Sequence, residues 1–266
     1  MRSDQVYYDM ITLLRLGFLF VIALLLAAVK CSPIRHETVS LVESNAFHGN
    51  HQPDFAKDTT DIHGYLALAK SQLYVDAEKA MANAKVVLKL SQKHQWDKGK
   101  VLAYNLLSTF YLMDGSHDML RELSNETILL TKKVNLPIYN AHARRFVAES
   151  FSEYRQWDSA QVNYERALKT FVDMKDDSSR ALCLESMGNM WRERDKIELA
   201  TAHYQQSYDI FERLRLRSNM ASVLESRAYM HVRLNQHGQA EKYFIRSLAL
   251  FQEAKNLFGE ISVLNN

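Results

Sequence analysis

Glycine and proline are scarce in this sequence. The 266 residues include 8 Gly and 3 Pro, about 4% of the chain, whereas an average protein contains about 12%. Sheet proteins need both residue types in their many turns. The scarcity therefore argues against a sheet fold and predicts an all-α protein. Hydrophobic residues at 47% and charged residues at 24% exclude disorder of the whole chain.

Cysteine is also scarce, and neither sign of charge dominates. Cys31 and Cys183 are the only cysteines and can form at most one disulfide, so the fold does not depend on a disulfide framework. The chain has 33 basic and 31 acidic side chains, for a net charge of +2. Because a nucleic-acid binder usually needs a concentrated basic face, we expect no nucleic-acid partner.

One long hydrophobic run lies near the start of the chain. Residues 16–29 read LGFLFVIALLLAAV, between Arg15 and Lys30. Fourteen helical residues span about 21 Å, less than the ~30 Å of a bilayer core, which favours a secretory signal. Extension back to Ile11 gives a span of sufficient length if Arg15 snorkels to the headgroups. Residues 1–30 are therefore predicted to be a signal peptide or a membrane anchor, in preference to a buried helix.

The residue after this run raises the question of lipidation. Cys31 resembles the start of a bacterial lipoprotein, but Lys30 stands where such motifs carry Gly, Ala or Ser. Under both main alternatives, the following residues are carried across a membrane or held at one. We predict a membrane-anchored or secreted, periplasmic location, with the remaining domain outside the cytoplasm.

Residues 31–60 lack apolar periodicity. With Pro33 and Pro53 they are predicted to form a flexible linker. His48-x-x-His51 has a spacing that metal ligands use, but nothing in this stretch supplies a rigid scaffold. We therefore predict a solvated linker, and neither a metal nor a cofactor.

The rest of the chain repeats with a period of forty residues. Offsets of four, eight and eleven residues place further apolar side chains on the same helix face. Three columns of the period hold mostly small or apolar residues: Ala80, Leu120, Ala160, Ala200 and Ala240; Ser108, Ala148, Gly188 and Ala228; and Ala103, Ala143, Cys183, Val223 and Val263.

Each period is predicted to contain two amphipathic helices. The first runs from about residue 100 to 113 and the second from about 117 to 133, and both recur every forty residues. Small residues let two helices cross at 8–10 Å, and an aromatic side chain fills the remaining gap. Because a single helix pair cannot bury both faces, the units must stack. Residues 61–266 are predicted to be a repeat domain of about five units and a partial sixth, which places Ile261, Val263 and Leu264 in packing columns.

These columns resemble the tetratricopeptide repeat. The residues that carry the resemblance are Gly188, Trp191, Ala200, Tyr204 and Tyr208, and the stretch Ala160-x-x-x-Tyr164-x-x-Ala167-Leu168. The match covers about residues 61–256, and its forty-residue step resembles a long-helix variant of the usual thirty-four-residue unit. The resemblance implies a right-handed superhelix, an α-solenoid of stacked antiparallel helix pairs, preceded by the N-terminal hydrophobic segment.

Catalytic motifs are absent from the sequence. It contains no phosphate-binding glycine loop, H-E-x-x-H, C-x-x-C or G-x-S-x-G. Cys183 shares a column with Ala103 and Val223, which predicts a buried small side chain rather than a nucleophile. Trp96, Trp157 and Trp191 are interpreted as packing residues. We therefore expect no enzymatic activity.

The resemblance also implies a concave groove, lined by the first helix of each unit, that binds an extended or helical peptide. The family's inward positions are polar here and differ between units. A solvated helix face, or pairing of Arg145 and Arg192 with Glu149 and Glu185, is the alternative interpretation. The two glutamates argue against a ligand that ends in a carboxylate. The candidate ligand-binding residues are Asn105, Arg145, Glu149, Glu185, Asn189, Arg192, Glu225 and Tyr229.

The sequence thus predicts a non-enzymatic scaffold that binds a protein or peptide at or outside the membrane, to which its N-terminal segment connects it. The alternative is an extracytoplasmic sensor or input domain of a bacterial signalling or transcription regulator, of which this chain would be a truncated part.

Overall fold

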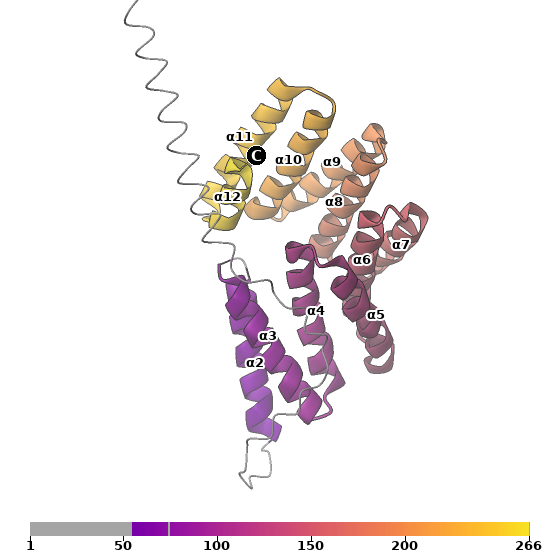
Figure 1. Ribbon diagram of the computed structural model, residues 1–266, viewed down its shortest axis with the longest axis vertical. Coiled ribbons are helices and arrows are strands. Elements are labelled where there is room, and N and C mark those ends of the chain that lie inside the picture. The colour runs from indigo at the N-terminus through magenta and orange to yellow at the C-terminus, as the bar shows by residue number, and fades with distance from the viewer. Residues whose placement is uncertain (1–54, 74, 266) are drawn as a thin grey trace, which may run out of the picture. The chain divides into compact units, whose positions relative to one another are not determined.

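The computed structural model describes residues 55–73 and 75–265, and all the regular structure in these ranges is helical (Figure 1). The helices are α2 (Phe55–Gln72), α3 (Ala77–Lys93), α4 (Asp97–Asp114), α5 (His117–Val134), α6 (Pro137–Glu153), α7 (Trp157–Asp173), α8 (Asp177–Glu193), α9 (Ile197–Arg213), α10 (Arg217–Arg233), α11 (His237–Glu253) and α12 (Leu257–Leu264). The all-α prediction is confirmed for this part of the chain.

The helices pack in tandem, each against the next one in the chain. We call α2, α4, α6, α8, α10 and α12 the first helices and α3, α5, α7, α9 and α11 the second helices. A first and a second helix form each unit, so α2 to α11 make five units and α12 starts a sixth. They belong to one compact body, Pro53–Asn266. The predicted stack of helix pairs is thereby observed, while its handedness stays a prediction.

A constant step of twenty residues separates the helices. From Ala77 of α3 to Leu257 of α12, every helix starts twenty residues after the previous one. The same turn closes the helix each time. The first residue after the turn donates its N–H to the carbonyl five residues earlier, as Gln156 does to Phe151 at 2.8 Å and Lys196 does to Trp191 at 2.9 Å. This is the bond that completes a Schellman-type helix end.

Each of these turns contains a residue with positive φ. At this position the left-handed conformation favours glycine, and Gly115 fulfils that preference with φ of 74°. The other turns use residues with side chains, and Asn tolerates the conformation better than most. These residues, all with φ between 51° and 57°, are Gln95, Asn135, Arg155, Lys175, Asp195, Arg215, Asn235 and Lys255.

Helix starts have local causes as well. The Asp176 carboxylate accepts the N–H of Ser179 at 3.0 Å at the start of α8. Asn256 accepts the N–H of Gly259 in the same way at the start of α12. Both bonds satisfy N–H groups that have no partner inside the helix. At the start of α6, Pro137 needs no such partner.

One predicted small-residue column includes a close contact between two helices. Gly188 of α8 faces Tyr204 of α9, and a Cβ atom at Gly188 would lie 2.6 Å from the tyrosine ring. Tyr204 is fully buried, as is Tyr164 one unit earlier. The idea that an aromatic side chain fills the space beside a small residue is therefore confirmed in this unit. Cys183 is also buried, as predicted, and burial raises the pKa of its thiol to about 12.

Two predicted packing residues at the end of the array are exposed instead. Ile261 and Leu264 of α12 are 59% and 69% exposed, although Val263 is buried. The equivalent residues one unit earlier, Ala221 and Leu224, are buried because α11 follows and packs on α10. No second helix covers α12 among the described residues, and this accounts for the difference.

The start of the helical array also differs from the predicted boundary. Because α2 begins at Phe55, the last residues of the linker predicted at 31–60 are helical. The rest of that linker, the predicted signal or anchor at 1–30 and Cys31 lie outside the described residues. None of the helices in the described ranges combines the length and apolar character that a membrane span requires.

The contact between α8 and α9 gives a direct test of the packing. We expect Gly188→Ala to lower the free energy of unfolding by about 1–3 kcal/mol, because the new Cβ meets the Tyr204 ring. Gly64→Ala in α2 is the matched control, since a Cβ there meets nothing within 4 Å. Alanine is a better helix former than glycine, so the free energy of unfolding of the control should rise by up to about 1 kcal/mol. Urea unfolding measures both, and equal effects would contradict the packing account.

Candidate binding surface on the first helices

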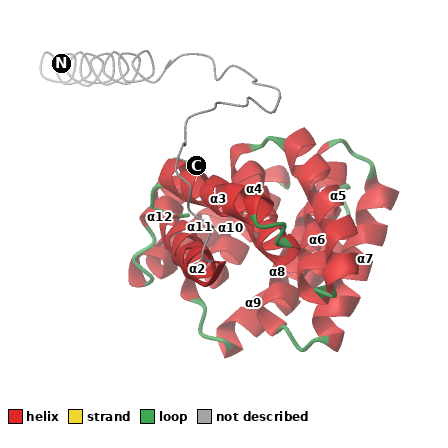
Figure 2. Cartoon of the chain, turned by 90° about the horizontal axis from the view of Figure 1, so that it is seen from below, coloured by secondary structure: helices red, strands yellow, loops and turns green. Residues whose placement is uncertain are grey.

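The first helices form one continuous layer. Neighbouring first helices touch one another from α2 through α12, whereas neighbouring second helices do not touch within the described ranges. Figure 2 shows α8 and α10 near the middle of the array, with α5, α6 and α7 at its right-hand side. We call the surface of the first helices that faces away from the second helices the inner face.

The eight candidate ligand-binding residues all lie on first helices of four successive units. Arg145 and Glu185 are buried, and the other six are partly buried. Asn105 is on α4, Arg145 and Glu149 are on α6, Glu185, Asn189 and Arg192 are on α8, and Glu225 and Tyr229 are on α10. Since none of the eight is fully exposed, a simple solvated helix face does not describe them.

Arg145 and Glu149 pair with each other on α6. Their Nη1 and Oε1 atoms are 3.3 Å apart, and both side chains are largely buried. The Glu149 carboxylate also accepts a hydrogen bond from Ser186 of α8. Arg145 Nε is buried and has no hydrogen-bond partner. The pairing that the sequence left open is therefore realised here, although a buried pair of this kind adds little net stability.

Glu185 is the most unusual group on this surface. It is 7% exposed, and its Oε1 accepts hydrogen bonds from Ser222 at 2.7 Å and Ser226 at 3.4 Å, both on α10. Burial raises the pKa of Glu185 to about 7, and the negative charge of Glu149 acts in the same direction. The serine hydroxyls and Arg145 favour the ionised form but do not offset the burial.

Glu225 repeats this arrangement one unit later. Its Oε1 accepts a hydrogen bond from Ser262 of α12 at 2.8 Å, and burial raises its pKa. The partner follows the carboxylate by 37 residues in both units, as it does in the pair of Glu149 and Ser186. Sequence reasoning missed these serines, although Ser222 and Ser262 stand forty residues apart and could have been found as a column.

The remaining candidates have partners of their own. Asn189 accepts the Tyr204 hydroxyl at 2.8 Å, which ties it to the second helix of its unit. Arg192 pairs with its neighbour Glu193 at 3.1 Å rather than with Glu185, and its guanidinium lies 5.8 Å from the centre of the Tyr229 ring. The amide oxygen of Asn105 is buried without a hydrogen-bond partner. Arg192 also donates to the Ser226 carbonyl of α10 at 3.4 Å, so Arg192 and Tyr229 lie together where α8 meets α10.

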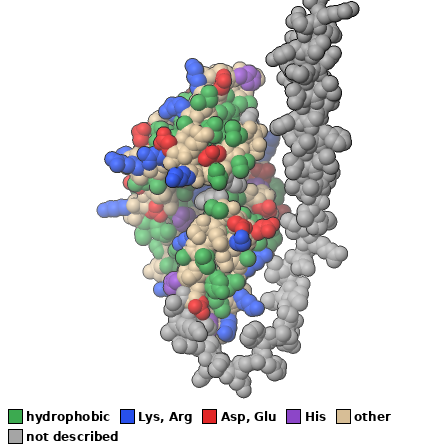
Figure 3. Space-filling view, turned by 90° about the vertical axis from the view of Figure 1, so that its left-hand side faces the viewer, with side chains coloured by type: hydrophobic (Ala, Val, Ile, Leu, Met, Phe, Trp, Pro, Cys, Tyr) green, Lys and Arg blue, Asp and Glu red, His purple; other side chains and the backbone are tan. Residues whose placement is uncertain are grey.

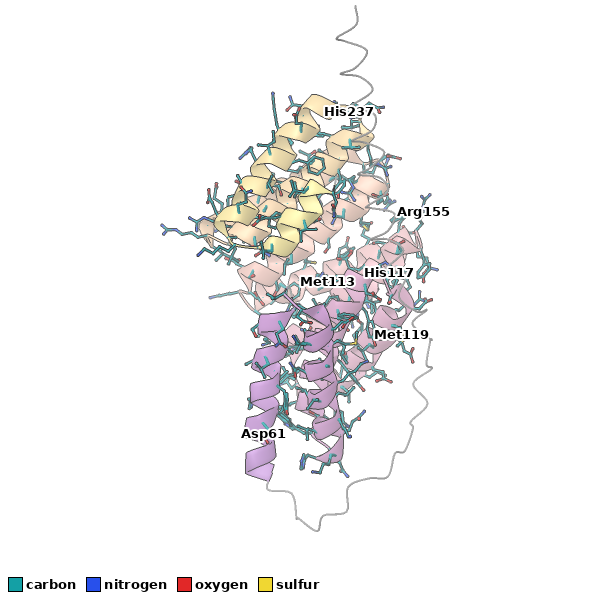
Figure 4. All side chains as sticks on the ribbon, turned by 60° about the vertical axis from the view of Figure 1, so that its left-hand side comes forward. Asp61, Met113, His117, Met119, Arg155 and His237 are labelled. Atoms are coloured by element: carbon teal, nitrogen blue, oxygen red, sulfur yellow. The ribbon has the colours of Figure 1, made fainter. Side chains whose placement is uncertain are left out.

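The turns that join first to second helices form one edge of the array. Figure 4 labels His117 at the start of α5, Arg155 between α6 and α7, and His237 at the start of α11. The His117 ring lies 3.8 Å from the Glu153 carboxylate, and its Nδ1 is buried without a partner. These contacts link adjacent units at the edge.

The described surface carries charged and hydrophobic side chains without a large patch of one kind on the face that Figure 3 shows. On the face drawn in Figure 3, basic and acidic side chains are interspersed with hydrophobic ones. Within the part of the chain that the structure describes, no group of three or more His, Cys, Asp or Glu side chains has a geometry that could hold a metal ion.

Comparisons with known proteins agree on the fold. No family model matches the chain, and no curated protein matches it. Among solved structures, aspartyl phosphate phosphatase F from Bacillus subtilis is 12% identical, with a TM-score of 0.55 over 73% of this chain and 60% of that one. BtubC from P. vanneervenii is 15% identical, with a TM-score of 0.49 over 76% and 93% of the two chains.

A third similar structure contains nearly identical TPR-like repeats. It is a putative kinesin light chain from Podosopora anserina, 11% identical, with a TM-score of 0.49 over 77% of this chain and 99% of that one. At these identities the likeness concerns the fold alone, and only the phosphatase, among these three, exceeds a TM-score of 0.5. The chain spans 60% of the phosphatase's length. The tandem helix pairs of the described residues form a helical repeat fold.

Burial of Glu185 predicts a pH-dependent stability. Between its ordinary pKa of 4.5 and its folded pKa of about 7, the folded state keeps a proton that the unfolded state has lost. The free energy of unfolding therefore falls as the pH rises through this window and stays lowered above it. Glu185→Gln is neutral at every pH. Between pH 4.5 and pH 8, its free energy of unfolding should therefore rise relative to that of the wild type by on the order of 2–3 kcal/mol.

Urea unfolding at the two pH values measures this difference. Glu212→Gln, in an exposed position near the end of α9, is the matched control and should follow the wild type. If Glu185→Gln also follows the wild type at both pH values, the carboxyl group is not held in its neutral form.

Proposed function

We propose that this protein is a non-enzymatic interaction scaffold of the tetratricopeptide type, in its forty-residue long-helix form, and that its inner face binds an extended or helical polypeptide. The observation that carries the proposal is the contrast between columns. The packing columns keep small or apolar side chains from unit to unit. The inner column of Asn105, Arg145, Glu185 and Glu225 changes from neutral to basic to acidic.

The contrast between conserved packing columns and a variable inner column has a physical reason if the inner face contacts different chemical groups along a ligand. A column that only packs must conserve volume, because overpacking and cavities both destabilise the fold. A column that meets a partner is free to vary with the partner's groups. Burying Glu185 lowers stability at neutral pH, and such a cost is typical of residues retained for a function. A merely solvated surface would not require it.

The candidate residues divide into two roles in this proposal. Arg192 and Tyr229 would contact the ligand, since they lie side by side on successive first helices and neither is fully buried. Arg145, Glu149, Glu185 and Asn189 have partners within the array. These four would shape and polarise the surface between the contacts, together with Glu225, which accepts a hydrogen bond from Ser262, and Asn105, whose amide oxygen is buried.

The location of this scaffold rests on the N-terminal sequence. We propose that the apolar run at residues 16–29 brings the repeats to a membrane or across it, as a retained anchor or a cleaved signal. The ligand would then be a protein or peptide on the outer side. The alternative of a sensor or input domain remains a prediction from sequence.

Site-specific photocrosslinking tests the inner face. We expect p-benzoylphenylalanine at Tyr229 or Val232 to capture a discrete polypeptide in the organism that makes the protein, since both lie on α10 and Val232 is exposed, forty residues after Arg192. The matched controls are Glu165 on α7 and Gln205 on α9, exposed positions on second helices. Capture of the same species from the control positions, or none from the inner positions, would contradict the proposal.

A second experiment tests whether the crosslink to the ligand depends on Arg192 and Tyr229. Arg192→Ala together with Tyr229→Ala should lower the yield of the crosslinked species from Val232 at least tenfold, with the circular dichroism spectrum unchanged. The two alanine substitutions leave the small-residue columns and the turns intact, so a loss of crosslinking would indicate weaker ligand binding rather than a folding defect. An unchanged yield would remove these two residues from the site.

A further inference from the structure

The turns that join second helices to first helices form the other edge of the array. Between α9 and α10 the chain reads Arg213-Leu214-Arg215-Leu216-Arg217, and the three arginines are exposed. Lys255 is exposed in the next turn along this edge, between α11 and α12. We call the following residues of the two turns the basic patch: Arg213, Leu214, Arg215, Arg217, Lys255 and Leu257.

Basic side chains outnumber acidic ones at the basic patch. Arg217 Nε donates to the Glu253 carboxylate at 3.0 Å, and this bond joins the two turns. A second acidic side chain, that of Glu212, is exposed and precedes Arg213 in the chain. Among the described residues, the side chains of Arg213 and Arg215 form neither an ion pair nor a hydrogen bond. Two guanidinium groups therefore face solvent without a partner.

The opposite edge uses its equivalent arginine to hold units together. Arg233 stands twenty residues after Arg213, at the end of α10. It pairs with Glu193 at 3.0 Å and with Asp195 at 2.7 Å, and both acidic residues belong to the preceding unit. Arg213 and Arg215 have no such structural role, which leaves their charges available to a partner outside the array.

A hollow of about 300 Å³ lies between the two turns of the basic patch. Its wall includes Arg215, Arg217, Ser218 and Asn219, and also Glu253, whose charge is already paired with Arg217. Guanidinium groups bind phosphate through paired N–H donors. The hollow is large enough for a phosphate group with bound water, and its chemistry suits an anionic headgroup.

Two leucines of the basic patch extend into solvent. Leu214 is 41% exposed and Leu257 is 72% exposed. Apolar side chains set among basic ones are typical of surfaces that lie in a membrane interface, where the apolar groups enter the bilayer and the basic groups meet lipid phosphates. An acidic polypeptide would neutralise the arginines but would leave the two leucines without a role. The composition of the patch therefore favours a lipid surface.

The chain that precedes the array arrives at the same edge. Because consecutive helices run in opposite directions, every first helix starts where the second helices end, and α2 starts there at Phe55. The apolar run at residues 16–29, proposed above to bring the repeats to a membrane, therefore joins the array at the edge that carries the basic patch.

We propose that the basic patch docks the array on an anionic lipid surface, with a lipid phosphate between Arg215 and Arg217 and with Leu214 and Leu257 in the interface. The inference rests on the proposed location at a membrane and does not depend on ligand binding by the inner face. Because the patch lies on an edge, docking would leave the inner face open to a ligand.

A fluorescent label tests the docking in the full chain. The environment-sensitive dye NBD is attached at Leu214→Cys, with Cys31→Ser also present and Cys183 buried. The protein is reconstituted into vesicles of phosphatidylcholine, alone or with one third phosphatidylglycerol. We expect a blue-shifted rise in emission only with phosphatidylglycerol, and its loss at high salt, which screens the charges. Leu234→Cys, 38% exposed at the equivalent position on the opposite edge, is the matched control and should not respond.

Removal of two charges tests the role of the arginines. Each basic side chain near an anionic surface contributes a factor of about five to the affinity. Arg213→Gln together with Arg215→Gln should therefore reduce the rise at Leu214→Cys at least fivefold. Arg155→Gln, an exposed position on the opposite edge, is the matched control and should leave the rise unchanged.

Three results would overturn the docking. If the labelled chain floats with both kinds of vesicle and gives the same spectrum in both, the basic patch does not bind anionic lipid, although the membrane location stands. If the chain floats with neither kind, the proposed location fails together with the docking. If polyglutamate produces the same rise at Leu214→Cys in detergent without vesicles, the basic patch binds acidic polypeptides instead.

Discussion

The rest of this structure depends on the backbone turn that ends each helix and starts the next one twenty residues later. From Gln95 onward, every turn combines a residue of positive φ with an N–H bonded to the carbonyl five residues earlier. Such a turn leaves little freedom in the angle between the helices. Because each helix starts at the same interval, the same face of each helix meets its neighbours, and one set of packing contacts serves every unit.

This regularity limits what side chains can do. Where a first helix approaches its second helix closely, only a small residue fits, as Gly188 does beside Tyr204. The turn positions are less restricted, since Arg, Lys and Asp occupy the left-handed conformation there at a moderate energetic cost. The inner face is freer still, and there the chain places carboxylates and their serine partners. The variation that distinguishes the units is concentrated where packing permits it.

The fold could be predicted because packing repeats in the sequence. A small residue every forty positions specifies a close helix contact, and Ala160, Ala200 and Ala240 are buried as expected. The twenty-residue step could not be found in this way, since first and second helices carry different residues. The positive φ at Arg155 or Lys175 was equally hidden, because these residue types do not indicate it. Ile261 and Leu264 were assigned to the core because their columns are buried elsewhere, and burial also requires a covering helix.

The candidate site was predicted less completely. The family's inward positions identified residues that do lie on first helices, including the carboxylates. The pairing of Arg145 with Glu149 was among the alternatives drawn from the sequence, but the serine partners of the glutamates could not be predicted, because those bonds join helices in different units. The bond of Glu185 to Ser222 depends on how far α10 is shifted relative to α8. The division of the eight residues into structural and free groups follows from those contacts, and sequence alone cannot provide it.

Removal of one complete unit tests the central claim most directly. Deletion of residues 177–216, which joins Asp176 to Arg217, removes α8 and α9 and preserves the twenty-residue step at the junction. We predict a folded protein that has lost the helical signal of two helices and still unfolds in a cooperative thermal transition. Deletion of residues 197–216 alone would place one first helix directly after another, and that protein should fail to fold. Both deletions preserve the twenty-residue step, so if they behave alike, the alternation of first and second helices does not determine the fold.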